Sequence, residues 1–492
     1  MNYISTRGNN KKVSAAEAIK TGMVPAGGLF VPETFPLFTK EELETMVTKN
    51  YQDIAQMVFE KYLTDFTKEE ISACVTGAYN NKNFTNEKIA PIVKNGENFS
   101  ILELWHGPTA AFKDMALQIM PYFLTTSKKK LNDKTETVIL VATSGDTGKA
   151  ALEGFKNIEG IRIIVFYPVD GVSEVQKLQM ATTEGNNVDV IAVEGNFDDC
   201  QTAVKNIFGD EKLKEKLKNK GIELSSANSI NWGRLLPQIA YYFSAYSQMV
   251  ISNEIKFGEE VDFSVPTGNF GNILAGYYAK KMGLPVKKFI CASNKNNVLS
   301  DFFKTGKYDR KREFYKTMSP SMDILISSNL ERFIFDISGC DGELISKLYN
   351  DLASKGEFEV DSNLKAVMDS LIVGDYCNED ETSNTIKNIY EKTGYVLDTH
   401  TAVAYKAAID KFDGRKIIID STASPYKFSN SVVKSINDKE YSDEFDAVVE
   451  IEKLSGMKIH RALEGLKNKK VLFSKVVKKS EVEESVKNIL KV

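Results

Sequence analysis

The sequence predicts an α/β protein with two open, mostly parallel sheets and a mainly helical N-terminal domain. Short, continuously apolar runs alternate with helix-like segments beyond about residue 96, as expected of parallel strands buried on both faces. Residues 1–95 instead read as mostly helical, because Thr39-Lys-Glu-Glu42 and Thr67-Lys-Glu-Glu70 both match the capping-box pattern that opens a helix. The apolar runs end in polar, glycine-containing loops, which is where open α/β sheets bind ligands.

The overall composition is that of an ordinary globular protein. The chain has 492 residues, of which 42% are hydrophobic and 26% charged, and its net charge is -4. This length suggests two to four domains, and the charge balance does not favour nucleic acid as a partner. No apolar stretch reaches the roughly 18 residues of a membrane span, and the first residues have no apolar core of signal-peptide length. We therefore expect a cytoplasmic protein without a membrane partner.

Cysteine and histidine are too few and too scattered for a metal site or a disulfide framework. The five cysteines include no CxxC pair, and the three histidines are far apart in sequence. We expect no bound metal and a reducing compartment. The cysteines are Cys74, Cys200, Cys291, Cys340 and Cys377.

A first series of strands is predicted at residues 137–142, 162–167 and 188–193. Helices should follow from about Lys149 and from about Val172, and a long charged helix should extend to about Lys220. This alternation predicts a small parallel sheet with helices on its faces.

A second series is predicted after a helix that begins near Trp232. Its strands lie at 261–266, 288–292 and 416–420, with a helix over 273–282. We expect a large domain formed by residues 96–135 and 255–430, a small α/β domain at 136–254, and a C-terminal segment at 431–492 that packs on the large domain.

Two of the loops have the composition of an anion site. The loop Gly268-Asn-Phe-Gly-Asn272 lies between a strand and a helix, so its backbone N–H groups can converge on a phosphate, although a tight turn alone would also explain it. The loop Ser144-Gly-Asp-Thr-Gly-Lys149 does not fit the nucleotide-binding P-loop, because that pattern needs glycine at position 143 and Ser or Thr at position 150.

Several motifs, in order along nearly the whole chain, resemble the threonine synthase family, pyridoxal phosphate (PLP) enzymes of the tryptophan-synthase-β fold type, also called PLP fold type II. The segment that resembles the cofactor-lysine motif is His106-Gly-Pro-Thr-Ala-Ala-Phe-Lys-Asp114. The other matching segments are Tyr3–Gly8, Gly27–Pro32, Ala142–Gly148, Ser226–Asn231 with Arg234, Pro266–Asn272, Ser319–Ile324 and Ser327–Arg332.

The resemblance implies a set of cofactor-binding residues. Lys113 would carry PLP as a Schiff base and later shuttle a proton, with Phe112 packing beside the cofactor or in the core. The loop formed by Gly268, Asn269, Phe270, Gly271 and Asn272 would hold the cofactor phosphate, and Thr422 would hydrogen-bond the pyridine nitrogen unless it is a turn residue before Pro425. Asp146 falls near the cofactor's 3′-oxygen, where its charge would be repelled. It would therefore share a proton, face elsewhere, or cap the following helix.

The resemblance also implies substrate contacts. Hydroxyl groups and the backbone of Gly145–Thr147 would bind the α-carboxylate, and Arg234 would bind the substrate phosphate in a bidentate manner or form a structural ion pair. The candidate residues are Thr109, Ser144, Thr147, Asn228, Ser229 and Arg234.

The implied reaction converts O-phospho-L-homoserine and water to L-threonine and phosphate by γ-elimination and β-addition of water. A serine/threonine dehydratase-like lyase of the same fold and a non-catalytic PLP-binding homologue are the alternatives. The protein would act as a monomer or a homodimer, since the sequence does not distinguish between them.

Overall fold

The larger sheet forms the centre of the molecule in the computed structural model, which describes residues 1–143, 145–170 and 172–492. Within these residues its strand order is β13-β10-β9-β14-β4-β3, and every neighbouring pair is parallel except β3 with β4. The strands are β3 (Ile92–Lys94), β4 (Phe99–Glu103), β9 (Val261–Pro266), β10 (Val286–Ser293), β13 (Ile372–Tyr376) and β14 (Ile417–Ser421).

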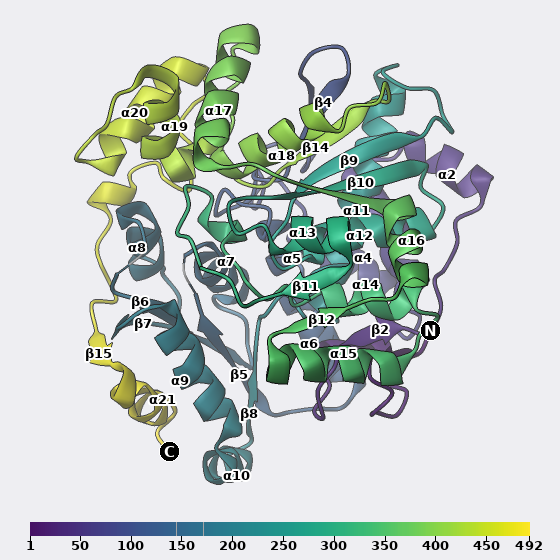
Figure 1. Ribbon diagram of the computed structural model, residues 1–492. Helices are drawn as coiled ribbons and strands as arrows, with labels where there is room; N and C mark the ends of the chain where they lie inside the picture. Colours follow the sequence, from purple (N-terminus) through teal and green to yellow (C-terminus); the bar gives the residue numbers. More distant parts are fainter. Residues whose placement is uncertain (144, 171) are drawn as a thin grey trace.

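The smaller sheet lies to the lower left in Figure 1 and is parallel throughout its described strands. Its order is β15-β7-β6-β5-β8, formed by β5 (Glu136–Ala142), β6 (Ile161–Pro168), β7 (Val188–Glu194), β8 (Ile222–Ser225) and β15 (Val476–Lys478). Two short antiparallel pairs complete the strands, β1 (Tyr3–Ser5) with β2 (Phe30–Pro32) and β11 (Lys307–Asp309) with β12 (Glu357–Glu359). The predicted fold class is confirmed by these two mostly parallel sheets and the helical N-terminal region.

Helices cover both sheets. The first part of the chain has α1 (Ala15–Thr21), α2 (Lys40–Val47), α3 (Tyr51–Tyr62), α4 (Lys68–Ala78), α5 (Asp114–Leu117), α6 (Met120–Lys130), α7 (Asp146–Phe155), α8 (Glu174–Ala181), α9 (Phe197–Gly209), α10 (Glu211–Asn219) and α11 (Trp232–Ile251). The second part has α12 (Gly271–Lys281), α13 (Val298–Thr305), α14 (Leu330–Ile337), α15 (Gly342–Lys355), α16 (Ser362–Leu371), α17 (Glu379–Thr393), α18 (Thr399–Asp410), α19 (Ser429–Asn437), α20 (Glu444–Ser455) and α21 (Val482–Leu490). Short 3₁₀ turns are η1 (Pro320–Met322), η2 (Pro425–Phe428), η3 (Leu466–Asn468) and η4 (Lys479–Glu481).

Both predicted capping boxes in the N-terminal region are present. The side chains of Thr39 and Thr67 accept hydrogen bonds from the backbone N–H groups of Glu42 and Glu70. Each glutamate carboxylate in turn accepts a hydrogen bond from the backbone N–H of its capping threonine. The long charged helix expected before Lys220 is instead two helices, α9 and α10. They are separated at Asp210, whose carboxylate accepts the first N–H groups of α10 and so starts a new helix.

Packing moves one of the expected domain boundaries. Helix α11 was assigned with the small domain at 136–254, but all except a few of its residues are buried against α12, α3 and α5 in the core of the large sheet and the N-terminal region. Its composition explains this, because Trp232 and a run of tyrosines, phenylalanine and leucine leave no polar face. The small sheet's own chain therefore ends near β8.

The C-terminal segment also differs from the expectation for residues 431–492. Helices α19 and α20 pack beside α17 as expected of a large-domain extension, but the chain then runs down the side of the molecule (Figure 1). There β15 pairs with β7 of the small sheet, Val476 opposite Ala192, and α21 packs against α9. Val482 and Val486 contribute to the small domain's core, which is the apolar burial that draws the tail there.

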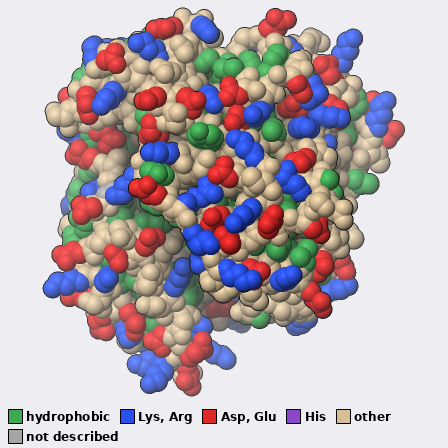
Figure 2. All heavy atoms as spheres, in the orientation of Figure 1, with side chains coloured by type: hydrophobic (Ala, Val, Ile, Leu, Met, Phe, Trp, Pro, Cys, Tyr) green, Lys and Arg blue, Asp and Glu red, His purple; other side chains and the backbone are tan. Residues whose placement is uncertain are grey.

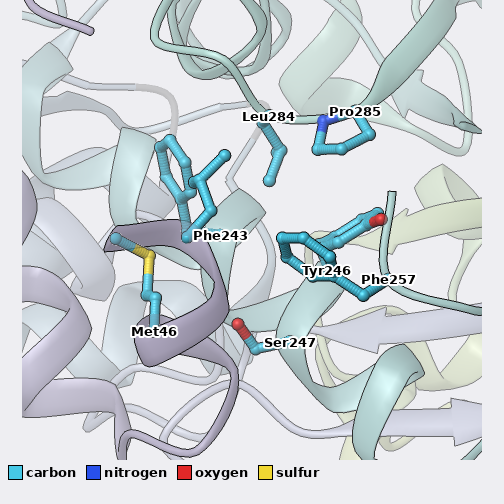
Figure 3. Close-up of a pocket in the computed structure, with 8 residues that line it drawn as sticks. Met46, Phe243, Tyr246, Ser247, Phe257, Leu284 and Pro285 are labelled. Carbon is cyan, nitrogen blue, oxygen red and sulfur yellow. The ribbon is translucent and has the colours of Figure 1, made fainter. Parts of the chain in front are cut away.

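The surface agrees with the balanced composition. In Figure 2 basic and acidic side chains are interspersed over the face shown. None of the described helices is both long and apolar enough to cross a membrane. Figure 3 shows a pocket between α2 and α11, lined by residues such as Met46, Phe243 and Leu284, that has room for about one water molecule and includes none of the predicted site residues.

Candidate active site

Two distant segments of the chain meet at Lys113. The segment 106–114 leads from β4 into α5, and Lys113 is the residue directly before that helix. Ala111 forms an antiparallel bridge with Ala423, and the backbone N–H of Phe112 donates to the carbonyl of Thr422 at 2.8 Å. The turn after β14 therefore lies beside the lysine.

Lys113 is a buried amine whose nearest acid is on the other domain. Its side chain is 14% exposed, its Nζ lies 3.9 Å from a carboxylate oxygen of Asp146, and it sits 5.1 Å from the centre of the Phe112 ring. Burial lowers the pKa of Lys113, Asp146 acts in the opposite direction, and the nearby charges of Lys427 and Arg234 lower it further. A larger share of this amine is thus neutral at pH 7 than for an exposed lysine, as a nucleophilic amine requires.

Asp146 is held from four sides. Its Oδ1 accepts from Gln176 at 2.9 Å and pairs with Lys427 Nζ at 2.7 Å, while its Oδ2 accepts from the Ser321 hydroxyl at 3.2 Å and faces Lys113. Burial alone would raise the pKa of Asp146, but the charges of Lys427 and Lys113 outweigh it and hold the pKa below the usual range. The residue is an ionised carboxylate.

The helix-capping alternative for Asp146 is wrong. The N-cap of α7 is Gly145, and Asp146 is the first helical residue without a capping hydrogen bond. Its side chain points instead toward the groups that contact it from both domains.

The loop before α12 exposes a row of backbone donors. The N–H groups of residues 268–272 donate to no acceptor among the described residues, because they precede and open the helix. The positive φ of this loop lies at Phe270, with a value of 63°, whereas Gly268 and Gly271 do not have positive φ. Free amides at the start of an 11-residue helix favour an anion such as a phosphate.

Neutral hydrogen bonds and one buried cation fix this loop. Ser327 donates its hydroxyl to the carbonyl of Gly268 at 2.8 Å, and Asn329 donates its backbone and side-chain N–H groups to the carbonyl of Asn269, both at 3.1 Å. Asn329 in turn accepts from the guanidinium of Arg332 at 2.6 Å.

Arg332 links this loop to two other parts of the protein. It is fully buried, and besides Asn329 it donates to the carbonyls of Ile230, in the loop before α11, and Phe30, in β2 of the N-terminal region. One side chain therefore holds the 268–272 loop, the loop before α11 and the N-terminal region together.

The predicted substrate residues Asn228, Ser229 and Arg234 lie in and after the loop between β8 and α11. Asn228 is exposed, and its side chain accepts from Ser229 at 3.3 Å. Arg234 is 3% exposed, donates to the carbonyl of Ala227, and has an Nε without a partner among the described residues. Burial lowers the pKa of Arg234 to about 10. It forms no ion pair with a described carboxylate, so the structural ion-pair alternative is not observed.

The other substrate candidates are placed differently. Thr109 uses both its N–H and its hydroxyl to donate to Asp114, at 2.8 and 2.7 Å, so its hydroxyl proton is already engaged within the lysine segment. Thr147 lies on α7 beside Asp146 and has no side-chain hydrogen bond to a described residue. Ser144 lies outside the described residues.

Reasoning from the sequence missed Lys427, Gln176 and Ser321. Lys427 is a lysine between Tyr426 and Phe428, an apolar setting that is unusual for this residue and that could have marked it as buried and paired. Ser321 falls in a segment that had been matched as a motif, but its partner lies 175 positions away, so no local pattern connects them.

Two family models match the chain. The model described as "Threonine synthase N terminus" matches residues 2–79, and the model described as "Pyridoxal-phosphate dependent enzyme" matches residues 92–350. Among curated relatives, "Threonine synthase-like 1" of Homo sapiens is 43% identical over 461 residues, covering 90% of this chain and 61% of the relative. The chain thus spans less than two thirds of that relative's length.

Threonine synthases match over most of their length. The enzyme of Pseudomonas aeruginosa is 38% identical over 88% of this chain and 90% of its own, and that of Saccharomyces cerevisiae is 38% identical over 93% of each. Among solved structures, PLP-bound threonine synthase from Brucella melitensis superposes with a TM-score of 0.89 at 34% identity, covering 99% of both chains. The yeast threonine synthase structure gives the same TM-score and identity.

Proposed function

Because this chain belongs to the threonine synthase family of pyridoxal-phosphate-dependent enzymes, we propose that it converts O-phospho-L-homoserine and water to L-threonine and phosphate. Arg234 carries this proposal. It is a buried guanidinium without a carboxylate partner among the described residues, near enough to Lys113 to lower its pKa. An unpaired buried cation beside the reactive amine favours a substrate that brings its own phosphate.

The described residues fit the cofactor. The unpartnered N–H groups of residues 268–272 would hold its phosphate, and the buried amine of Lys113 would bind its aldehyde carbon. The Thr422 hydroxyl has no hydrogen bond to a described residue and is the group we assign to the pyridine nitrogen. When bound, pyridoxal phosphate supplies an electron sink that stabilises negative charge on the carbon atoms of an amino acid.

The side chains then have separate tasks. Lys113, with its lowered pKa, would accept the proton from Cα of the bound substrate. Arg234 binds the substrate phosphate and orients the Cγ–O bond, and Asn228 and Ser229 lie in the same loop as further contacts. We keep the cytoplasmic location and a monomeric or homodimeric state as predictions from the sequence.

A product assay separates the proposal from its alternatives. With O-phospho-L-homoserine, we expect phosphate and threonine in equal amounts and no ammonia. Ammonia release from serine or threonine would instead support the dehydratase-like lyase, and no turnover by a PLP-loaded protein would support the non-catalytic homologue.

The role of Lys113 has its own test. Lys113→Ala should abolish the visible absorbance of the bound cofactor and lower turnover by roughly 1,000-fold or more, because both the covalent link and the proton acceptor are lost. Lys130→Ala, a surface lysine paired with Glu70, is the control and should change neither. Retention of absorbance and turnover in Lys113→Ala would contradict the proposal.

A further inference from the structure

A buried ion pair joins the two domains beside Lys113. Asp146 lies on α7 of the small domain, and Lys427 lies in η2 after the last strand of the large sheet. The side chains of Lys427 and Asp146 are 0% and 4% exposed, and their charged atoms are 2.7 Å apart. Lys427 also donates to the carbonyl of Thr109 in the lysine segment at 3.0 Å.

Of the two further contacts of Asp146, one lies within the small domain and the other crosses the same boundary. Gln176, on α8 of the small domain, and Ser321, in η1 of the large domain, both donate to its carboxylate. The backbone N–H of Ser321 donates to Nε2 of His400 at 3.1 Å, so His400 is held as an acceptor and fixes Ser321 from the large-domain side. Three elements besides its own helix, α8, η1 and η2, therefore hold the Asp146 carboxylate in place.

The charge of Lys427 explains why a carboxylate can be buried at position 146. A lone buried carboxylate close to the anionic oxygen of the cofactor would be repelled, and a lone buried ammonium would be equally costly. Together Asp146 and Lys427 carry no net charge while still presenting polar atoms to Lys113, 3.9 Å away. A single neutral amide would present similar polar atoms but would form no ion pair across the domain boundary.

We propose that Asp146 and Lys427 act as one neutral unit that positions Lys113 and ties the small domain to the large domain at the cofactor. Lys427 is in this sense a positioning residue, since it acts through Asp146 and through the carbonyl of Thr109. The inference requires the pyridoxal phosphate site but not the proposed reaction, so the two can fail separately.

A double-mutant cycle tests the unit. The variants are Asp146→Asn, Lys427→Met and the two combined, and the measurements are the affinity of the apo protein for pyridoxal phosphate and the visible absorbance of the bound cofactor at fixed pH. Each single variant leaves one buried charge unpaired and should weaken affinity by roughly 10- to 100-fold, with a shifted absorbance maximum. The combined variant should lie within about fivefold of the parent, a coupling of at least tenfold.

A second ion pair on the same helix provides the matched control. Lys149 and Glu153 are also buried and lie 2.6 Å apart on α7, but they contact Thr183 and Lys156 and none of the site residues. Lys149→Met and Glu153→Gln should alter the melting temperature and leave the absorbance maximum unchanged. An equal spectral shift in this pair would show that the effect is general destabilisation and would overturn the proposal.

Two further outcomes of the double-mutant cycle test whether Asp146 and Lys427 act as one unit. If the effects of Asp146→Asn and Lys427→Met simply multiply in the combined variant, the two side chains act independently and the proposal is wrong. If a single variant does not fold, the combined variant decides alone. Near-normal cofactor affinity then supports the neutral unit, and loss of binding by a folded combined variant overturns it.

Discussion

On the large-domain side of the site, the loop at 268–272 is held by neutral hydrogen bonds and by the guanidinium of Arg332, whereas the small-domain side is held by the ion pair of Asp146 with Lys427. The loop's donors are backbone N–H groups, which no substitution other than proline removes. The charged groups of Asp146 and Lys427, in contrast, lie on side chains, and each compensates the buried charge of the other. We therefore expect the first side to hold a phosphate independently of the second, and the second to respond to changes at Lys113.

Replacement of Arg332 should have the largest effect on the loop side. Arg332→Leu leaves the carbonyls of Phe30 and Ile230 and the side-chain oxygen of Asn329 without their donor, at roughly 3 kcal/mol or more of unfolding free energy. Urea denaturation should show this loss, and cofactor affinity should fall with it.

The neighbouring pair of Arg7 with Glu331 gives the comparison for that experiment. It joins the same N-terminal region to α14 through a partly exposed side chain, and it touches neither loop. Arg7→Leu leaves the buried carboxylate of Glu331 with the Thr6 hydroxyl as a remaining donor, so it should cost roughly 1–3 kcal/mol of unfolding free energy, but cofactor affinity should not change. Equal losses of cofactor affinity in the two variants would mean that Arg332 matters only for docking the N-terminal region.

A buried acid behind the loop makes the large-domain side sensitive to pH. Asp420 accepts from the Tyr242 hydroxyl at 3.1 Å, and burial raises its pKa to about 7, although Tyr242 and Asn272 partly oppose this. Between the ordinary value of 3.8 and about 7 the folded state keeps a proton that the unfolded state has released. The free energy of unfolding should therefore fall as pH rises through this window.

Asp420→Asn removes the titratable carboxyl group and should flatten the dependence of the unfolding free energy on pH. Urea denaturation at pH 5 and pH 7.5 compares the slopes, with the exposed Asp438→Asn as the control that should leave the slope unchanged. A slope that Asp420→Asn does not alter would assign the pH dependence to other groups.

Ser327 should produce the smallest change. Ser327→Ala removes one neutral hydrogen bond to the carbonyl of Gly268, worth about 1 kcal/mol, so cofactor affinity should weaken by about fivefold with an unchanged absorbance maximum. Ser328→Ala, at an exposed side chain that contacts Asn269, should have less effect. A shifted absorbance maximum in Ser327→Ala would contradict the distinction between the large-domain side and the small-domain side of the site.

The contrast between the 268–272 loop and the pair of Asp146 with Lys427 also explains what could be predicted from the sequence. The loop 268–272 lies between a strand and a helix that have their own local patterns, so its place and its donors follow from nearby residues. Asp146 was recognised by its motif, but its partner Lys427 is 281 positions later, and no periodicity connects them. Helix α11 was given to the wrong sheet for the same reason, because an all-apolar helix does not indicate which core it enters.

The position of β15 has a practical consequence for preparing the protein. This short strand covers the edge of β7, where the N–H of Ala192 donates to the carbonyl of Lys475 and Val477 lies opposite Val193. A chain clipped before residue 470 would leave that edge open, and open strand edges recruit other copies of the same chain. Oligomers seen in proteolysed or truncated samples should therefore be treated as edge-to-edge aggregates until the intact C-terminus has been verified by mass.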